Sequence, residues 1–185
     1  KMAIDAISGL SDVILAAAGN GPERRRRELL EYAEQAGAAG RFKILDPVPE
    51  DQVVDLLSLA DVSIVPVQES CESYRLCLPN KLFQSLAAGT PVVSTPLPEV
   101  GAIIENINHC FVATDYSPQA FANALEHALE DSKNAVISMP TEIQPEQLLA
   151  RYKFLAEALI LNKPIPAYPP LKHASNAIAA AARDR

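Results

Sequence analysis

One segment, residues 78–96 (LPNKLFQSLAAGTPVVSTP), carries the start and stop signals of a helix followed by a strand. Pro79 and Asn80 favour a helix start, and three apolar side chains at helical spacing follow them. Gly89 stands where a left-handed residue can end the helix, and Pro91 prevents its continuation. Apolar residues then predict a short buried strand. The segment therefore predicts a helix beside a strand, which is the repeating unit of α/β proteins.

The rest of the chain repeats this alternation. Strands are predicted at residues 12–18, 42–45, 62–67, 92–95 and 110–113. Helices are predicted at residues 2–10, 23–38, 50–60, 80–88, 99–106, 119–130 and 144–161. Residues 12–18 are a continuous apolar run, as expected of a strand covered on both faces. Short β-α connections predict an α/β fold, a Rossmann-like parallel sheet with helices on both faces.

We assign residues 1–161 to this domain and residues 162–185, which are rich in Pro and Ala, to a C-terminal arm. The formal net charge of −7 and the aromatic content of 5% argue against a nucleic-acid surface. The three cysteines have neither the spacing of a disulfide framework nor that of a zinc site. We therefore expect a cytoplasmic protein that has no metal site.

Parallel sheets bind ligands beyond the carboxyl ends of their strands, so the loops at those ends are the candidate site. Gly19, Asn20 and Gly21 form a glycine turn between a predicted strand and a predicted helix. The long loop at residues 68–78 follows another strand and carries Glu69 and Glu72. Neither the dinucleotide fingerprint nor a P-loop is present.

The start of the helix in the opening segment is the best candidate for binding phosphate. Asn80 and Lys81 lie there, where backbone N–H groups lack helical partners and the helix dipole is positive. A second basic feature, Arg24–Arg27, is different, because consecutive residues point around the whole helix. We interpret these arginines as a solvated surface paired with neighbouring glutamates, with contact to a partner domain or an anionic membrane as the alternative.

Residues 78–100 resemble the retaining, glycogen-synthase-like group of GT-B glycosyltransferases, many of which read P-N-K-L-F-E-Y-x-A-A-G-x-P-V-V. The glycine turn at residues 19–22, the strand at 41–45 and the run at 56–66 occur in the order of that family's nucleotide-binding half. The resemblance covers residues 2–129. It implies the C-terminal domain of a two-domain enzyme, of which the first strand and the N-terminal acceptor domain lie outside this chain.

The resemblance also implies roles for individual residues. Pro79, Asn80 and Lys81 match the place where the donor diphosphate lies. Asp46, Pro47 and Val48 match the loop whose backbone groups read the base. Gln84 occupies the position of an acid that holds the ribose hydroxyls, and an uncharged amide binds them more weakly. The second acid of the family's E-x7-E form corresponds to Leu76, and Glu69 or Glu72 is the candidate replacement.

The implied function is transfer of a sugar from a nucleotide-diphosphate sugar, which is a substrate, with no cofactor. Lysine, the helix N-terminus and backbone N–H groups stabilise the charge of the leaving diphosphate. The chain contains no Asp-x-Asp sequence, the pattern that would suggest a bound metal. The implied partners are the nucleotide sugar, the N-terminal domain and, through that domain, a membrane surface. Two alternatives stay open: a noncatalytic nucleotide-sugar-binding or scaffold domain, and a nucleotide-sugar epimerase of the same fold.

Overall fold

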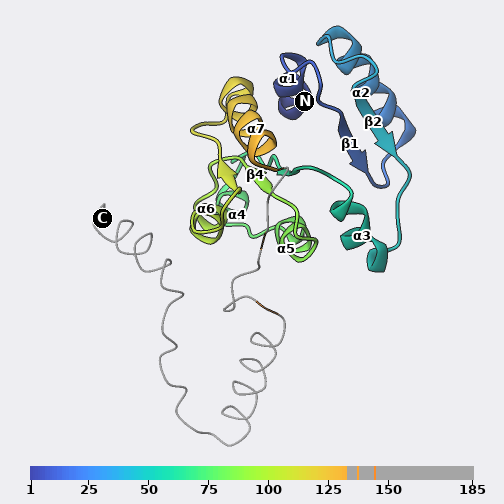
Figure 1. Ribbon diagram of the computed structural model, residues 1–185. Helices are drawn as coiled ribbons and strands as arrows, with labels where there is room; N and C mark the ends of the chain where they lie inside the picture. The colour runs from blue at the N-terminus through green and yellow to red at the C-terminus, as the bar shows by residue number, and fades with distance from the viewer. Residues whose placement is uncertain (133–136, 138–143, 145–185) are drawn as a thin grey trace, which may run out of the picture. The chain divides into compact units, whose positions relative to one another are not determined.

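The computed structural model describes residues 1–132, 137 and 144 of the 185-residue chain (Figure 1). The described core belongs to one compact unit, Lys1–Ile137. The domain boundary expected between residues 161 and 162, and the helix predicted at residues 144–161, lie outside the described residues.

Helices and strands alternate through this unit. The elements are α1 (Met2–Ser8), β1 (Leu15–Ala18), α2 (Glu23–Gln35), β2 (Phe42–Leu45), the 3-10 helix η1 (Glu50–Gln52), α3 (Val53–Ser58), β3 (Ser63–Val65), α4 (Glu72–Arg75), α5 (Asn80–Ala87), β4 (Val92–Ser94), α6 (Pro98–Ile104), β5 (Phe111–Val112) and α7 (Pro118–Ser132). This order confirms the predicted α/β class. The opening segment behaves as its residues indicate, since α5 starts directly after Pro79 and Gly89 follows its end with a φ of 70°.

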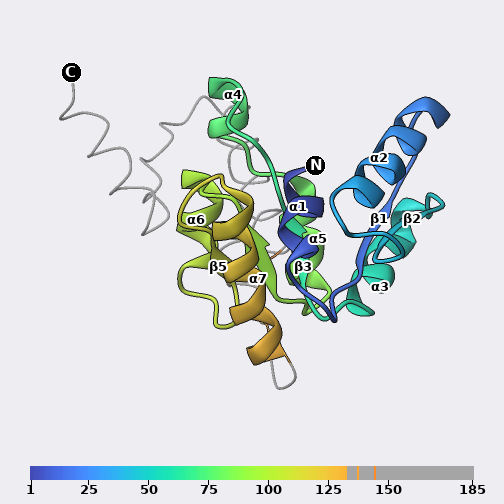
Figure 2. The same ribbon diagram turned by 90° about the horizontal axis from the view of Figure 1, so that it is seen from above.

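The strands are parallel, as predicted, but they form two sheets rather than one. β1 pairs with β2, and β3, β4 and β5 form the second sheet in that order. Figures 1 and 2 show the β1–β2 pair on one side of the unit and the second sheet on the other. In Figure 1, α1 and α7 lie above the strands and α3 and α5 lie below them.

The first strand corrects one prediction. The run at residues 12–18 was expected to form a strand covered on both faces, but β1 begins only at Leu15, and Ala16–Ala18 are exposed. The apolar composition of a segment indicates that its side chains favour burial. It does not indicate whether a neighbouring strand is present, and among the described residues β1 has one strand neighbour only.

The core holds the two sheets together through α1 and α7. Phe121 of α7 and Ile7 of α1 are almost completely buried and belong to one apolar cluster that also includes Val93 of β4 and Phe42 of β2. The connection between sheets is therefore made by helices, with residues from both sheets packed beneath them. No helix within the described residues has the length and apolar character needed to cross a bilayer.

Candidate functional site

The ends of β1 and β2 bring the first group of predicted site residues together. The register pairs Ala18 with Leu45, so Gly19 and Asp46 leave the sheet side by side. Gly19 has a φ of 147°, which side-chain-bearing residues rarely adopt, so glycine is required for this turn. Asn20, Gly21 and Pro47 are exposed at the same edge, and Gly19 and Val48 are partly buried.

The second group is built on the start of α5. Pro79 is extended (φ −70°, ψ 141°), and Asn80 is the first helical residue. The side chains of Asn80 and Lys81 are exposed, while Gln84, one turn further along, is partly buried. The first turn of a helix has unpaired N–H groups and a positive dipole end. An anion beside Lys81 would therefore meet both the ammonium group and the helix N-terminus.

A buried hydroxyl pair fixes the position of α5 against the second sheet. The Ser85 hydroxyl donates to the carbonyl oxygen of Lys81 at 2.6 Å, and the Ser85 and Ser63 hydroxyls lie 2.7 Å apart. Ser85 is fully buried, and Ser63 belongs to β3. The flanking Leu82 and Leu86 are also buried. The bond to Lys81 lies within α5, whereas the contact with Ser63 anchors the helix to β3, the strand that precedes the acidic loop.

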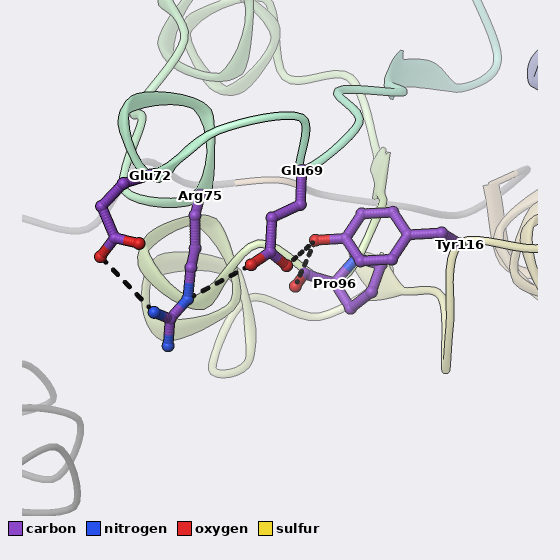
Figure 3. A network of polar contacts seen from close by, with 5 residues as sticks. All are labelled: Glu69, Glu72, Arg75, Pro96 and Tyr116. Atoms are coloured by element: carbon purple, nitrogen blue, oxygen red, sulfur yellow. Dashed lines mark hydrogen bonds and ion pairs between the residues drawn. The ribbon is translucent and has the colours of Figure 1, made fainter.

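That acidic loop is held by a network of polar contacts (Figure 3). The Tyr116 hydroxyl lies 3.0 Å from Glu69 Oε2 and 3.3 Å from the carbonyl oxygen of Pro96. Arg75 forms ion pairs with Glu69 and Glu72, each at 3.5 Å. Glu69 therefore lies between a phenol and a guanidinium group, at the carboxyl ends of the second sheet's strands. Arg75 belongs to α4, a short helix inside the region predicted as a loop.

Tyr116 is a residue that sequence reasoning missed, since it follows β5 and lies 47 positions from Glu69. One feature could have indicated it: Tyr116 follows a strand of the same parallel sheet as Glu69, and the loops that follow parallel strands lie at the same edge of the sheet. Burial, and then the hydrogen bond to Glu69, raises the pKa of Tyr116 above its ordinary value. The phenol therefore remains a hydrogen-bond donor throughout the neutral pH range.

We expect Tyr116→Phe to accelerate trypsin cleavage after Arg75. Loss of one hydrogen bond, about 0.5–1.5 kcal/mol, increases the population of the locally open loop roughly two- to thirteenfold. Cleavage rates from mass spectrometry test this result. The matched control is Tyr32→Phe, which removes a 2.6 Å bond to Asp5 far from this loop and should leave cleavage at Arg75 unchanged. Equal rates in wild type and Tyr116→Phe would show that the contact does not restrain the loop.

The structure does not bring all predicted residues into one contact network. The glycine turn and Asp46 belong to the first sheet, whereas Glu69, Glu72 and the α5 residues belong to the second. Among the described residues, Arg26 approaches Asp46 at 3.9 Å, and no hydrogen bond or ion pair joins the two groups. Within that same part of the chain, no cluster of three His, Cys, Asp or Glu side chains is arranged to hold a metal. The cysteines described there are free thiols.

A family comparison matches residues 1–131 to "Glycosyl transferases group 1". D-inositol 3-phosphate glycosyltransferase of Corynebacterium urealyticum is 30% identical over 154 residues, which are 82% of this chain and 34% of that protein. The 2-deoxystreptamine N-acetyl-D-glucosaminyltransferase of Streptomyces fradiae is 33% identical over 88 residues, which are 48% of this chain and 19% of that protein. The chain thus spans about a third or less of these relatives.

Solved structures give the same answer for the fold. Anabaena HepE, solved with UDP-glucose, superposes on 85% of this chain with a TM-score of 0.65 and 19% identity, and 44% of that chain is covered. Sucrose-phosphate synthase of Thermosynechococcus elongatus has a TM-score of 0.64 and 18% identity over 85% of this chain and 42% of its own. At these identities the likeness establishes a shared fold.

Proposed function

Since this chain belongs to the group 1 glycosyl transferases, we propose that it is the donor-binding domain of an enzyme that transfers a sugar from a nucleotide-diphosphate sugar. The observation that carries the proposal is the exposed Asn80–Lys81 start of α5, a helix that Ser85 anchors to Ser63 of β3. That place favours a diphosphate because Lys81, unpaired N–H groups and the helix dipole all act on the same negative charge.

The chemistry that this site would supply is electrostatic. As the bond between sugar and phosphate breaks, negative charge grows on the leaving diphosphate, and Lys81 with the α5 N-terminus stabilises that charge. Preorganised donors lower the barrier because they need not reorient during the reaction. The fixed position of α5, through Ser85 and Ser63, supports such preorganisation. No cofactor or metal is part of this proposal.

The remaining site residues receive roles by position. We assign recognition of the nucleotide base to the backbone groups of Asp46, Pro47 and Val48. The turn at Gly19, Asn20 and Gly21 would let a phosphate group of the ligand approach the backbone closely. Gln84 would accept hydrogen bonds from the ribose hydroxyls. Glu69 is the better candidate than Glu72 for the second acid, because Tyr116 and Arg75 both restrain it.

The acceptor would bind to a second domain, since the relatives are much longer than this chain. We propose that this chain is the C-terminal half of a retaining GT-B enzyme, cytoplasmic, with an N-terminal acceptor domain that can contact a membrane surface. HepE is described in complex with UDP-glucose, which makes UDP a suitable first probe.

Calorimetry with UDP and with inorganic pyrophosphate tests these assignments separately. We expect Lys81→Ala to weaken binding of both probes about tenfold, because it removes a charge-assisted contact with phosphate. Gln84→Ala should weaken the binding of UDP about threefold and leave the binding of pyrophosphate unchanged, because only UDP has a ribose. Lys43→Ala, an exposed lysine within β2, is the matched control. Unchanged UDP affinity in both site variants would contradict the site assignment.

Metal removal gives a second, independent expectation. Addition of EDTA should leave the UDP affinity of this chain unchanged, because the proposed phosphate ligands are Lys81 and backbone N–H groups. Titration with UDP in the presence and absence of EDTA, with Mg²⁺ restored as a control, measures the difference. A large loss of affinity that Mg²⁺ reverses would instead indicate a metal-dependent site.

A further inference from the structure

Arg26 is a half-buried arginine of α2 that faces the edge of the first sheet. Its side chain is 26% exposed, and its guanidinium group forms a long ion pair with Asp46, at 3.9 Å. Hydrogen bonds from N–H to oxygen are about 2.7–3.2 Å long, so this ion pair lacks one. Among the described residues the Arg26 side chain donates no hydrogen bond, whereas that of Arg41 donates to four carbonyl oxygens. The N–H groups of Arg26 are therefore available to a ligand.

The ion pair lies beside the loop to which we assign recognition of the base. α2 starts at Glu23, directly after the glycine turn, and packs beside β2 (Figures 1 and 2). Arg26 is about one helical turn further along, and Asp46 directly follows β2. The Asp46 side chain is 97% exposed, so its carboxylate is also accessible to a ligand. A hydrogen-bond donor and an acceptor thus face each other at this end of the first sheet.

We infer that Arg26 and Asp46 determine base specificity, and that they select a base with a keto edge, uracil or guanine. The inference rests on the proposed function, since it extends base recognition from the backbone of residues 46–48 to two side chains. Uracil and guanine each present a carbonyl acceptor next to a ring N–H donor. Arg26 donates to the carbonyl oxygen, and Asp46 accepts from the ring N–H. Cytosine and adenine carry an amino group in place of that carbonyl, so a donor would face the donors of Arg26.

The charges of this pair favour a neutral base over a phosphate group. A phosphate that reached Arg26 would also lie close to the Asp46 carboxylate, and like charges repel at short range. Lys81 differs, because among the described residues it forms no ion pair with an acid, and it lies at a helix start. A base satisfies both members of the pair, since it offers an acceptor to Arg26 and a donor to Asp46. The two sheets therefore divide the work, with the base at the first and the diphosphate at the second.

UDP and CDP are the decisive probes, because their bases differ only at this edge. We expect calorimetry to show UDP binding at least about tenfold more tightly than CDP. Arg26→Met keeps the aliphatic stem and should weaken UDP about tenfold, bringing the two affinities within about threefold of each other. Arg24→Met, at an arginine that is 91% exposed and paired with Glu28, is the matched control and should leave the ratio unchanged. Weaker binding of pyrophosphate to Arg26→Met would overturn the inference, because Arg26 would then be a phosphate ligand.

Asp46→Asn tests the acceptor at a side chain too exposed to affect folding. The amide donates as well as accepts, so CDP should bind about threefold more tightly than to wild type. GDP and ADP extend the test, since GDP should bind more tightly than ADP, and the tighter of UDP and GDP identifies the base. Preference for CDP or ADP, or equal ratios of UDP to CDP affinity in wild type and both variants, would overturn the inference. If Lys81→Ala still weakened UDP, the proposed nucleotide site would stand, whereas no binding of any nucleotide would overturn the proposed function itself.

Discussion

Phe121→Ala is expected to lower the free energy of unfolding by about 4 kcal/mol, the largest effect of any single truncation considered. Phe121 is fully buried in α7, within the cluster that contains Ile7 of α1 and Val93 of β4. Truncation removes a large apolar side chain and leaves a cavity that the surrounding helices fill only in part. Since whole domains are stable by about 5–15 kcal/mol, this loss is between about a quarter and four fifths of the stability of such a unit.

Urea unfolding, monitored by circular dichroism, measures the change in the free energy of unfolding. The dependence of that free energy on urea concentration should be the same in variant and wild type. Phe121→Leu keeps much of the volume and should give an intermediate loss. Leu30→Ala, on the exposed side of α2, is the control and should cost less than about 1 kcal/mol. A similar loss at positions 30 and 121 would indicate that the α1–α7 contact is not the main core of this unit.

Arg41→Met is expected to be the next most destabilising change, with a loss of about 3 kcal/mol. The Arg41 guanidinium group donates hydrogen bonds to the carbonyl oxygens of Ile7, Ser8, Leu10 and Gly37. The first three carbonyls are at or just beyond the C-terminal end of α1, where the usual i+4 partners are lacking, and the Ile7 carbonyl also accepts a bond from the Leu10 N–H. A cation at this end also interacts favourably with the helix dipole. Methionine keeps the aliphatic bulk but removes the guanidinium donor from all four oxygens.

Two variants separate the hydrogen bonds of Arg41 from its charge. Arg41→Lys keeps the charge but not the planar fork that reaches several carbonyls, so we expect a partial loss. Arg24→Met removes an arginine whose side chain is 91% exposed and whose partner is Glu28, and no measurable change is expected. Urea unfolding again gives the comparison. Equal stability of Arg41→Met and wild type would mean that water replaces the guanidinium group without loss.

The site shows where local patterns were sufficient. The start of α5 at Asn80 and the left-handed Gly89 after its end were predicted because the backbone preferences of Pro, Asn and Gly act within a few residues. The surface pairing of the arginine run was also confirmed at Arg24 and Arg25 with Glu28. In each case the interaction joins residues that are neighbours in the sequence.

Other features of the site depended on distant residues and could not be predicted in this way. Tyr116 reaches Glu69 across 47 positions, and Ser85 reaches Ser63 across 22. Nothing in the local sequence of either residue marks its partner, because the sheet brings them together. The same reason explains β1, whose apolar residues predicted burial although Ala16–Ala18 are exposed.

The sequence alone therefore determined the α/β class, the order of the elements and the start of α5 at Asn80, since propensity and apolar spacing are local properties. Only the tertiary structure decided that the strands divide into two sheets, that Tyr116 and Arg75 restrain Glu69, and that Arg26 faces Asp46. These features arise from contacts between residues far apart in the chain. Their energy depends on which surfaces meet, and no single segment contains that information.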